Sequence, residues 1–231
     1  MVNLQEKLQT SSFSLITSIY SNQSKLAVAA EKAGSDAIIV NINTTNQSGS
    51  TRFGSFEFEE DSIREIINNV KIPVGLFIGD TAYLNDTDWE RIINSGLDFI
   101  NMFAHFLPFS ILVDKRISKM VSIGPGYLIE QVKSLSDDPN IDSLLSSVTP
   151  SQAIGQNLNA LDLSTVKILA NLSSKPLLLL TQKTFSPEHV EYISKIGCRG
   201  LILNDVVTGK TEGSMDSAIK SYRRNINLIH N

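Results

Sequence analysis

Residues 33–41, AGSDAIIVN, join the end of a helical stretch through a glycine turn to a short apolar run rich in β-branched side chains. The same arrangement returns at 95–103, SGLDFINMF, and at 196–204, IGCRGLILN. Apolar runs without an apolar/polar alternation are expected of parallel strands that are covered on both faces. A glycine before each run suits the left-handed position that ends a helix. The repeat therefore predicts successive units of helix, glycine turn and parallel strand.

The same alternation of short apolar runs and longer segments of helical periodicity continues along the whole chain. Two further runs are entered through proline, in VKIPVGLFIG and SSKPLLLLTQ. The strands are predicted at Phe13–Tyr20, Asp36–Ile42, Val74–Gly79, Asp98–Phe103, Lys119–Ile123, Ser143–Val148, Leu177–Thr181 and Gly200–Asn204. This spacing predicts one α/β domain over residues 1–231, a closed (β/α)₈ or TIM barrel. A doubly wound open sheet is the alternative, and DDPNIDSLLSSVTP, which holds the sixth strand, is also compatible with helix.

Capping residues predict where three of the helices begin. The predicted segments start at Asp61 or Ser62 and end near Val70, start at Asp86 or Thr87 and run through Ser95, and start at Ser186-Pro187-Glu188 and run through Ile196. Residues 43–60 then form a long irregular connection on the functional face of the barrel. Two interpretations of this connection stay open, a lid over the barrel mouth and a surface hairpin built from Phe53, Phe56 and Phe58.

Charge and composition exclude several classes of partner. Twenty basic and twenty-four acidic residues give a net charge of −4, so nothing draws the chain to nucleic acid or anionic lipid. No apolar run approaches the roughly twenty residues that span a membrane. Cys198 has no second thiol for a disulfide or a metal cluster, and we expect it to be buried near a strand start. We therefore expect a cytoplasmic protein without nucleic-acid, membrane or metal partners, which could form a homodimer through its outer helices.

Catalytic side chains of a barrel lie where strands end and the following loops begin, and three residues there are candidates for chemistry. Asp80 directly follows an apolar strand, where burial would raise its pKa toward that of a useful base. Lys183 follows LLLLTQ and could pair with a phosphate or form a Schiff base. His105 follows the fourth strand, and histidine is a side chain often used as a general acid or base.

Amide side chains at the same strand ends are candidates for binding a substrate. Asn41 and Asn204 stand seven residues after the glycine of their repeat, where they could donate to a substrate oxygen or tie down loop backbone. The predicted substrate-binding residues are Asn41, Asn43, Asn101, Asn204 and Gln182. Five residues are expected to meet in one pocket: Asp80, Asn101, His105, Lys183 and Asn204. The chain has no HExxH, paired CxxC, nucleophile elbow or P-loop motif.

The last quarter of the chain, from LLLLTQKTFSPEHVEY to SMDSAIKSYRRNI, resembles the phosphate-binding barrels that include the ribulose-phosphate-binding group and N-acetylmannosamine-phosphate epimerases. In those proteins a loop leads into a helix opened by serine or threonine, proline and glutamate, and a second loop leads into a short helix whose N-terminus binds phosphate. The matching residues here are Thr184, Ser186, Pro187, Glu188, Thr208 and Gly209.

This resemblance implies a phosphate site at Thr208, Gly209 and Lys210. The family's loop glycines are replaced here by residues 181–183 and 204–206, and Asp205 would repel a phosphate. The implied function is an isomerase, epimerase or lyase acting on a phosphorylated or carboxylated metabolite without a cofactor. The alternatives are an FMN-dependent oxidoreductase and a barrel that binds a metabolite without catalysis.

Overall fold

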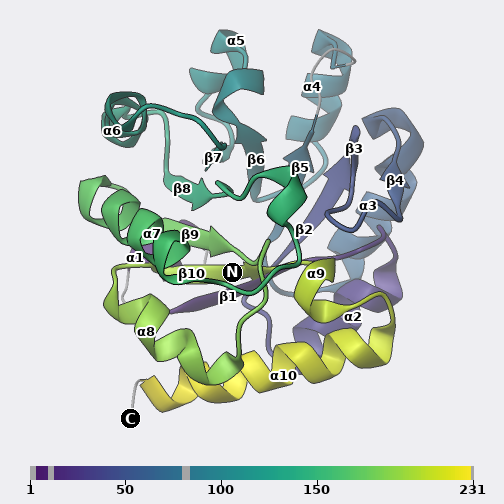
Figure 1. The fold of residues 1–231 in the computed structure, drawn as a ribbon. Helices are drawn as coiled ribbons and strands as arrows, with labels where there is room; N and C mark the ends of the chain where they lie inside the picture. Colours follow the sequence, from purple (N-terminus) through teal and green to yellow (C-terminus); the bar gives the residue numbers. More distant parts are fainter. Residues whose placement is uncertain (1–3, 10–12, 80–83, 230–231) are drawn as a thin grey trace.

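The computed structural model describes residues 4–9, 13–79 and 84–229. Its barrel strands run parallel and close in the order β1-β10-β9-β8-β7-β6-β5-β2, so that each strand pairs with its neighbours along the chain (Figure 1). The barrel strands are β1 (Ser14–Ser18), β2 (Ala37–Ile42), β5 (Val74–Ile78), β6 (Phe99–Phe103), β7 (Ser118–Ile123), β8 (Ser143–Ser146), β9 (Leu177–Leu180) and β10 (Gly200–Leu203). The predicted closed barrel is confirmed, and both the open sheet and the helical alternative for the sixth strand are wrong.

Helices surround the barrel, and α10 runs along its outside against α2, α8 and α9 (Figure 1). The helices are α1 (Leu4–Gln9), α2 (Ser24–Ala33), α3 (Phe56–Asn69), α4 (Asp86–Ile93), α5 (Phe109–Leu112), α6 (Ile129–Asp137), α7 (Ala160–Leu172), α8 (Val190–Lys195), α9 (Asp205–Thr208) and α10 (Glu212–Ile229). Short 3₁₀ turns are η1 (Ala104–Phe106), η2 (Ser151–Ala153) and η3 (Pro187–His189). No helix in these described ranges is both long and apolar enough to cross a membrane.

Two of the predicted helix starts need correction. The Ser55 side chain caps α3, so this helix begins about six residues before the predicted Asp61 or Ser62. Asn85 caps α4 by accepting from the Asp88 N–H at 2.9 Å, in place of Asp86 or Thr87. In both cases an earlier side-chain acceptor takes the free N–H groups of the first turn. The predicted Ser186-Pro187-Glu188 start is observed, with Pro187 in the first turn of η3.

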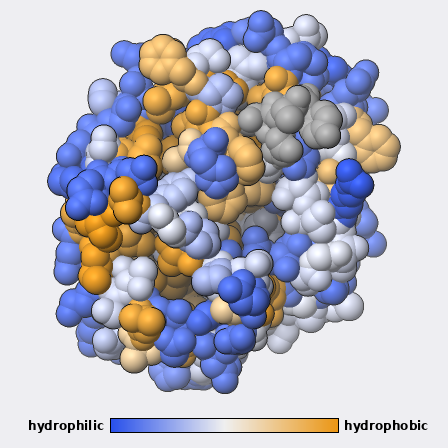
Figure 2. All heavy atoms as spheres, turned by 45° about the horizontal axis from the view of Figure 1, so that its top comes forward, coloured by the Kyte–Doolittle hydropathy of each residue, from blue (hydrophilic) through white to orange (hydrophobic). Residues whose placement is uncertain are grey.

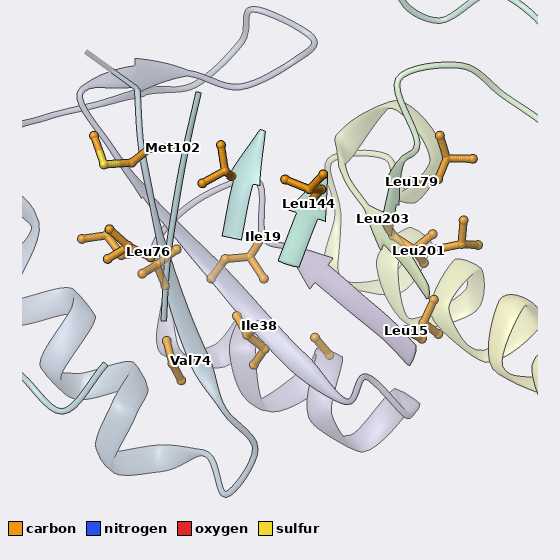
Figure 3. Packing of buried hydrophobic residues seen from close by; sticks show 14 of the residues in the cluster. Leu15, Ile19, Ile38, Val74, Leu76, Met102, Leu144, Leu179, Leu201 and Leu203 are labelled. Carbon is orange, nitrogen blue, oxygen red and sulfur yellow. The ribbon is translucent and has the colours of Figure 1, made fainter. Parts of the chain in front are cut away.

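Two apolar layers hold the barrel together. Outward-facing strand residues such as Leu76, Leu144 and Leu201 pack against the helices (Figure 3). Inward-facing residues form a second cluster inside the barrel, and Leu4 and Leu8 of α1 join it. Because α1 comes just before β1 in the chain, these two leucines close the end of the barrel where the strands begin. Cys198 lies in the outer layer as expected, and burial raises the pKa of its thiol to about 12.

The glycine repeat coincides with a repeated carboxylate brace. Asp36, Asp98 and Asp142 each precede an even-numbered barrel strand and accept from a backbone N–H of the preceding barrel strand, at 2.8–2.9 Å. The fourth equivalent position is Arg199, whose backbone N–H donates to the Leu177 carbonyl as the aspartates do to theirs. The glycines before three of these positions have the predicted left-handed φ values, 110°, 92° and 107°. The barrel is therefore built from four quarter units, and one of them lacks the brace.

The missing brace predicts the effect of two substitutions. Arg199→Asp should raise the free energy of unfolding by about 1 kcal/mol, because the Leu177 N–H gains a charged acceptor, and should raise Tm by about 2–4 °C. Asp142→Ala should lower both by similar amounts because the Lys119 N–H loses its acceptor. Urea unfolding of the two variants measures both effects. If Arg199→Asp is neutral while Asp142→Ala destabilises, the fourth unit does not have the geometry of the others.

Candidate functional site

A pocket of about 570 Å³, counted out to its open mouth, lies where the barrel strands end. All eight barrel strands contribute side chains to its wall or to its rim. These are Ser18, Ile39, Asn41, Phe77, Asn101, Phe103, Ser122, Leu145, Ser147, Leu180, Ile202 and Asn204. In the face shown in Figure 2, hydrophobic atoms are visible in and around a central hollow, and hydrophilic residues form most of the outer edge. This end of the barrel is where the fold predicts a site.

The quarter units place their side chains in the pocket in layers. In each unit, the third residue after the brace position belongs to the lower layer, and the fifth residue after it belongs to the upper layer. The lower layer consists of Ile39, Asn101, Leu145 and Ile202, and the upper layer of Asn41, Phe103, Ser147 and Asn204. Asn101 is therefore the one polar residue where the other three units have isoleucine or leucine.

Asn101 carries an unsatisfied hydrogen-bond donor at this depth. Its side chain is 1% exposed, and its Oδ1 accepts from the Ser122 hydroxyl at 2.9 Å. Its Nδ2 is buried and has no partner in the described part of the chain. A buried polar group without a hydrogen bond costs about 1–3 kcal/mol relative to a satisfied one. This cost is explained if a ligand in the pocket supplies the acceptor.

Asn204 carries a second free donor on the opposite side of the barrel, four strands away in the closed order. Its Oδ1 accepts from the Val206 N–H at 3.1 Å, which fixes the orientation of the amide. Its Nδ2 is buried without a partner among the described residues. The nearby Ser147 hydroxyl, which also lines the pocket, is unpaired in the same way. The pocket is therefore rich in donors that no described residue satisfies.

Asn41 lines the same pocket, but its side-chain amide already donates a hydrogen bond within the protein. Its Nδ2 donates to the Ile19 carbonyl at 3.2 Å, and its backbone is held by Asn22 on both sides. Asn22 also donates to Glu59, which accepts from the Gly54 N–H. Of the two roles left open for Asn41, this geometry supports the tying of loop backbone.

A hairpin roofs the pocket, so that both interpretations of residues 43–60 hold in part. Its strands are β3 (Thr44–Thr45) and β4 (Arg52–Phe53), and residues 44–47 line the pocket. At the tip, the Ser48 N–H donates to Asp205 at 3.1 Å, and Gln47 accepts from Gln182 at 3.5 Å. Phe56 and Phe58 belong to α3 and not to the hairpin, and Phe58 is 79% exposed.

Asn43 starts this hairpin and lies outside the pocket. Its φ of 51° is left-handed, a conformation that asparagine adopts more readily than most residues. Its backbone N–H donates to the Gly54 carbonyl at 2.8 Å. Its side chain borders a separate surface hollow with Arg52 and Phe53. The structure therefore places Asn43 as a turn residue.

Lys183 and Gln182 lie behind the pocket wall. Lys183 is 6% exposed, and its Nζ is 2.7 Å from the Asp162 carboxylate on α7, in a small cavity between β8, β9 and that helix. The Gln182 Oε1 accepts from the Thr149 N–H at 3.2 Å, and the residue borders the same cavity. Neither residue lines the mouth pocket.

His105 lies in η1 on the outer surface. Its Nδ1 is 2.5 Å from the Tyr127 hydroxyl, and its ring stacks on Phe103 with centroids 5.3 Å apart. Partial burial raises the pKa of Tyr127. These residues face a separate surface hollow, so the prediction that His105 and Lys183 share a pocket with Asn101 and Asn204 is wrong. Asp80, the expected base, lies outside the described residues.

Five of the backbone N–H groups in the loops expected to hold a phosphate are already used within the chain. The N–H groups of Val206, Val207 and Thr208 all donate to atoms of Asn204, and that of Gly209 donates to the Asp205 carbonyl. In the preceding loop, the N–H of Thr184 donates to the Gln156 carbonyl. Lys210 is exposed and does not line the pocket.

The pocket is nearly free of charge. Among the described residues that line it, Asp205 has the one charged side chain, and no lysine, arginine or histidine is present. Burial and the nearby Glu212 raise the pKa of Tyr20 at the rim, so this phenol is neutral at physiological pH. The described residues hold no group of three or more histidine, cysteine, aspartate or glutamate side chains that could bind a metal. The pocket can therefore donate hydrogen bonds and, at Asp205, exchange a proton.

No family model and no curated protein sequence matches this chain. Similar solved structures include a mutant tryptophan synthase alpha-subunit from Pyrococcus furiosus, with a TM-score of 0.70 and 12% identity over 91% of this chain and 98% of that one. Thiamine phosphate pyrophosphorylase from Pyrococcus furiosus has a TM-score of 0.66 and 14% identity over 99% and 100%. Phosphoribosyl anthranilate isomerase from Thermus thermophilus has a TM-score of 0.67 and 14% identity over 94% and 100%. The expected resemblance is thus confirmed at the level of the fold, and the chain is a (β/α)₈ barrel like these enzymes.

Proposed function

We propose that this chain is an enzyme that moves a proton on a small carbonyl compound held in the mouth pocket, as an isomerase or epimerase does. One observation carries the proposal: two buried amide donors without protein partners, on Asn101 and Asn204, line the same pocket as the carboxylate of Asp205. Donors fixed in a dry site stabilise an oxygen on which negative charge develops. A carboxylate beside them can take the proton that is lost.

The reaction follows from these groups. Asp205 takes a proton from the carbon next to the carbonyl, and the C–H electron pair moves toward the carbonyl oxygen, which becomes an enolate oxygen. An amide N–H of Asn101 or Asn204 donates to that oxygen. Return of the proton to the opposite face of the same carbon gives the epimer. For the isomer, the hydroxyl on that carbon passes its proton to the former carbonyl oxygen, and the proton held by Asp205 goes to the former carbonyl carbon, so that no electron donor or acceptor is needed. The prediction that Asp80 is the base remains, and the experiment below separates the two carboxylates.

The other reaction classes raised by the sequence have less support. Carbon–carbon cleavage through a Schiff base needs a free lysine in the pocket, and Lys183 is instead paired with Asp162 behind the wall. FMN needs phosphate donors after β9 and β10, and the N–H groups of Thr184 and of residues 206–209 in those loops already donate within the chain. A barrel that binds without catalysis shares the pocket and differs only in turnover.

Hydrogen exchange into heavy water tests the proposal without knowledge of the natural substrate. Dihydroxyacetone, D-ribose, D-ribulose and their monophosphate esters are incubated with the protein in D₂O, and deuterium at the carbon next to the carbonyl is measured by NMR. We expect exchange with at least one compound, and Asp205→Asn should slow it by about 10²–10⁴-fold because the base is lost.

Asp137→Asn is the matched control, because Asp137 is an exposed carboxylate on α6 and forms a surface ion pair with Lys133. It should leave the exchange rate unchanged. Asp80→Asn tests the residue that the sequence proposes as the base. The proposal fails if no compound exchanges, or if Asp205→Asn exchanges as fast as the parent protein.

A further inference from the structure

We infer that the ligand of the mouth pocket is an uncharged hydroxycarbonyl compound without a phosphate group. This inference rests on the function proposed above and narrows its substrate class. The inference departs from the phosphorylated metabolite that the resemblance implies. It depends on three features of the described residues: the charge of the pocket, the donors left free in it and the state of the expected phosphate loops.

The charge of the pocket disfavours an anion. Asp205 is buried at the rim and contributes the one formal charge among the described lining residues. Its Oδ2 accepts a hydrogen bond from the Ser48 N–H, and no described cation lies in the lining to offset its charge. Lys183, the nearest candidate from the sequence, is neutralised by Asp162. An anion in this pocket would therefore meet one negative charge and no compensating positive charge.

Many of the backbone donors in the loops that would bind a phosphate are already occupied within the chain. The Asn204 side chain and carbonyl take the first N–H groups of α9, which in a phosphate site would point at the ligand. At the start of α10, Thr211 and Ser214 cap one another in the same way, and Glu212 adds a negative charge. The N–H groups of Thr211 and Ser214 are therefore occupied by side chains of the same turn.

The remaining polar groups match hydroxyl and carbonyl oxygens. The Nδ2 atoms of Asn101 and Asn204 can each donate to a neutral oxygen from opposite sides of the barrel, and the unpaired Ser147 hydroxyl lines the same pocket. The Asp205 carboxylate can accept from a ligand hydroxyl. Phe77 and Phe103, whose ring centroids are 6.1 Å apart, give the pocket an apolar wall. A small polyhydroxy carbonyl compound uses all of these groups.

Matched pairs of ligands test the inference. The probes are dihydroxyacetone, D-ribose and D-ribulose, each with its monophosphate ester, and inorganic phosphate alone. Binding to the full chain is measured by thermal shift and titration calorimetry. We expect each uncharged compound that binds to do so at least about tenfold more tightly than its ester, because Asp205 repels the phosphate. Inorganic phosphate should give no shift.

Three variants test whether Asp205 causes the preference for the uncharged compounds. Asp205→Asn should reduce the preference for the uncharged member, because the repulsion is removed. Lys210→Met and Lys183→Met should leave the preference unchanged, since neither lysine faces the pocket. Each shift is read against the Tm of the same variant without ligand, so a change in stability does not affect the comparison.

The outcomes separate this inference from the proposed function. Tighter binding of the esters overturns the inference, especially if Lys210→Met weakens that binding. The proposed function still stands if those esters exchange deuterium. Tighter binding of the uncharged compounds without exchange supports the inference and shows a binding protein that does not catalyse. Absence of binding by every uncharged probe also overturns the inference.

Discussion

Gly75→Ala is expected to destabilise the protein by about 3 kcal/mol, near the upper end of the usual cost of overpacking a core. A methyl group added at Gly75 on β5 would lie 2.2 Å from the ring of Phe99 on β6, far inside van der Waals contact. Phe99 is fully buried in the barrel interior and cannot move aside without displacing the inner cluster. Urea unfolding measures the loss in the free energy of unfolding, and the slope of this free energy against urea concentration should be the same for both proteins.

A second substitution shows whether this contact is the cause. Phe99→Leu alone should cost about 1–2 kcal/mol because it leaves a cavity. Combined with Gly75→Ala, it should recover most of the loss, since the methyl group then occupies space that the ring has left. The two changes are therefore expected to be non-additive by more than 1 kcal/mol. If the costs of the two substitutions simply add, Gly75 is required for its backbone conformation and not because it leaves room for the Phe99 ring.

Asp162→Ala is expected to lower the free energy of unfolding by about 3 kcal/mol and Tm by about 6–12 °C. The substitution leaves the Lys183 ammonium, which is 6% exposed, without its counter-charge. It also removes the side chain that accepts from the Asn159 N–H at the start of α7. Thermal unfolding followed by circular dichroism measures the effect.

Substitution of Lys183, the other member of the ion pair, should lower the free energy of unfolding less. Lys183→Met keeps the length of the side chain and leaves behind Asp162, which is 25% exposed and can be solvated. We expect a cost of about 1 kcal/mol. The double variant Asp162→Leu with Lys183→Met should be more stable than Asp162→Ala, because no unpaired charge stays buried. If the double variant is as unstable as Asp162→Ala, the loss comes from the helix cap and not from the buried lysine.

The barrel itself could be predicted from the sequence because its strands are short apolar runs with clear boundaries. Seven of the eight observed strands lie within the predicted ranges, and β7 begins one residue earlier. The glycine repeat also located the quarter units, since a left-handed turn before a strand is a local requirement. Two aspartates of the brace, Asp36 and Asp98, stand in this repeat, whereas the unit that contains Asp142 lacks the glycine and was not recognised as a copy.

The long connection after β2 was harder to predict because its structure depends on distant residues. Hairpin strands of two residues each give no periodic signal. The tip is fixed by contacts with Gln182 and Asp205, more than 130 positions away in the sequence. The start of α3 at Phe56 follows from a serine cap at Ser55, which the acidic residues at 57–61 obscured.

The pocket could be predicted in part, and the period of two along each strand explains the failures. Leu178 faces the barrel interior and Leu179 faces the helices, so Lys183, which keeps the parity of Leu179, points toward α7. His105 has the inward parity of Phe103, but η1 interrupts the strand at Ala104. Asn101 could have been singled out, because the other three repeat copies have isoleucine or leucine at its position.

Because α1 closes the lower end, the described residues leave the barrel interior open at the mouth pocket. Leu4 and Leu8 fill the end where the strands begin, and the pocket opens at the other end beneath the hairpin. A substrate and its product must then use the same passage in opposite directions. For the enzyme proposed here, product that has not left prevents the next substrate from entering, so product inhibition is a consequence of the architecture, whatever the chemistry in the pocket.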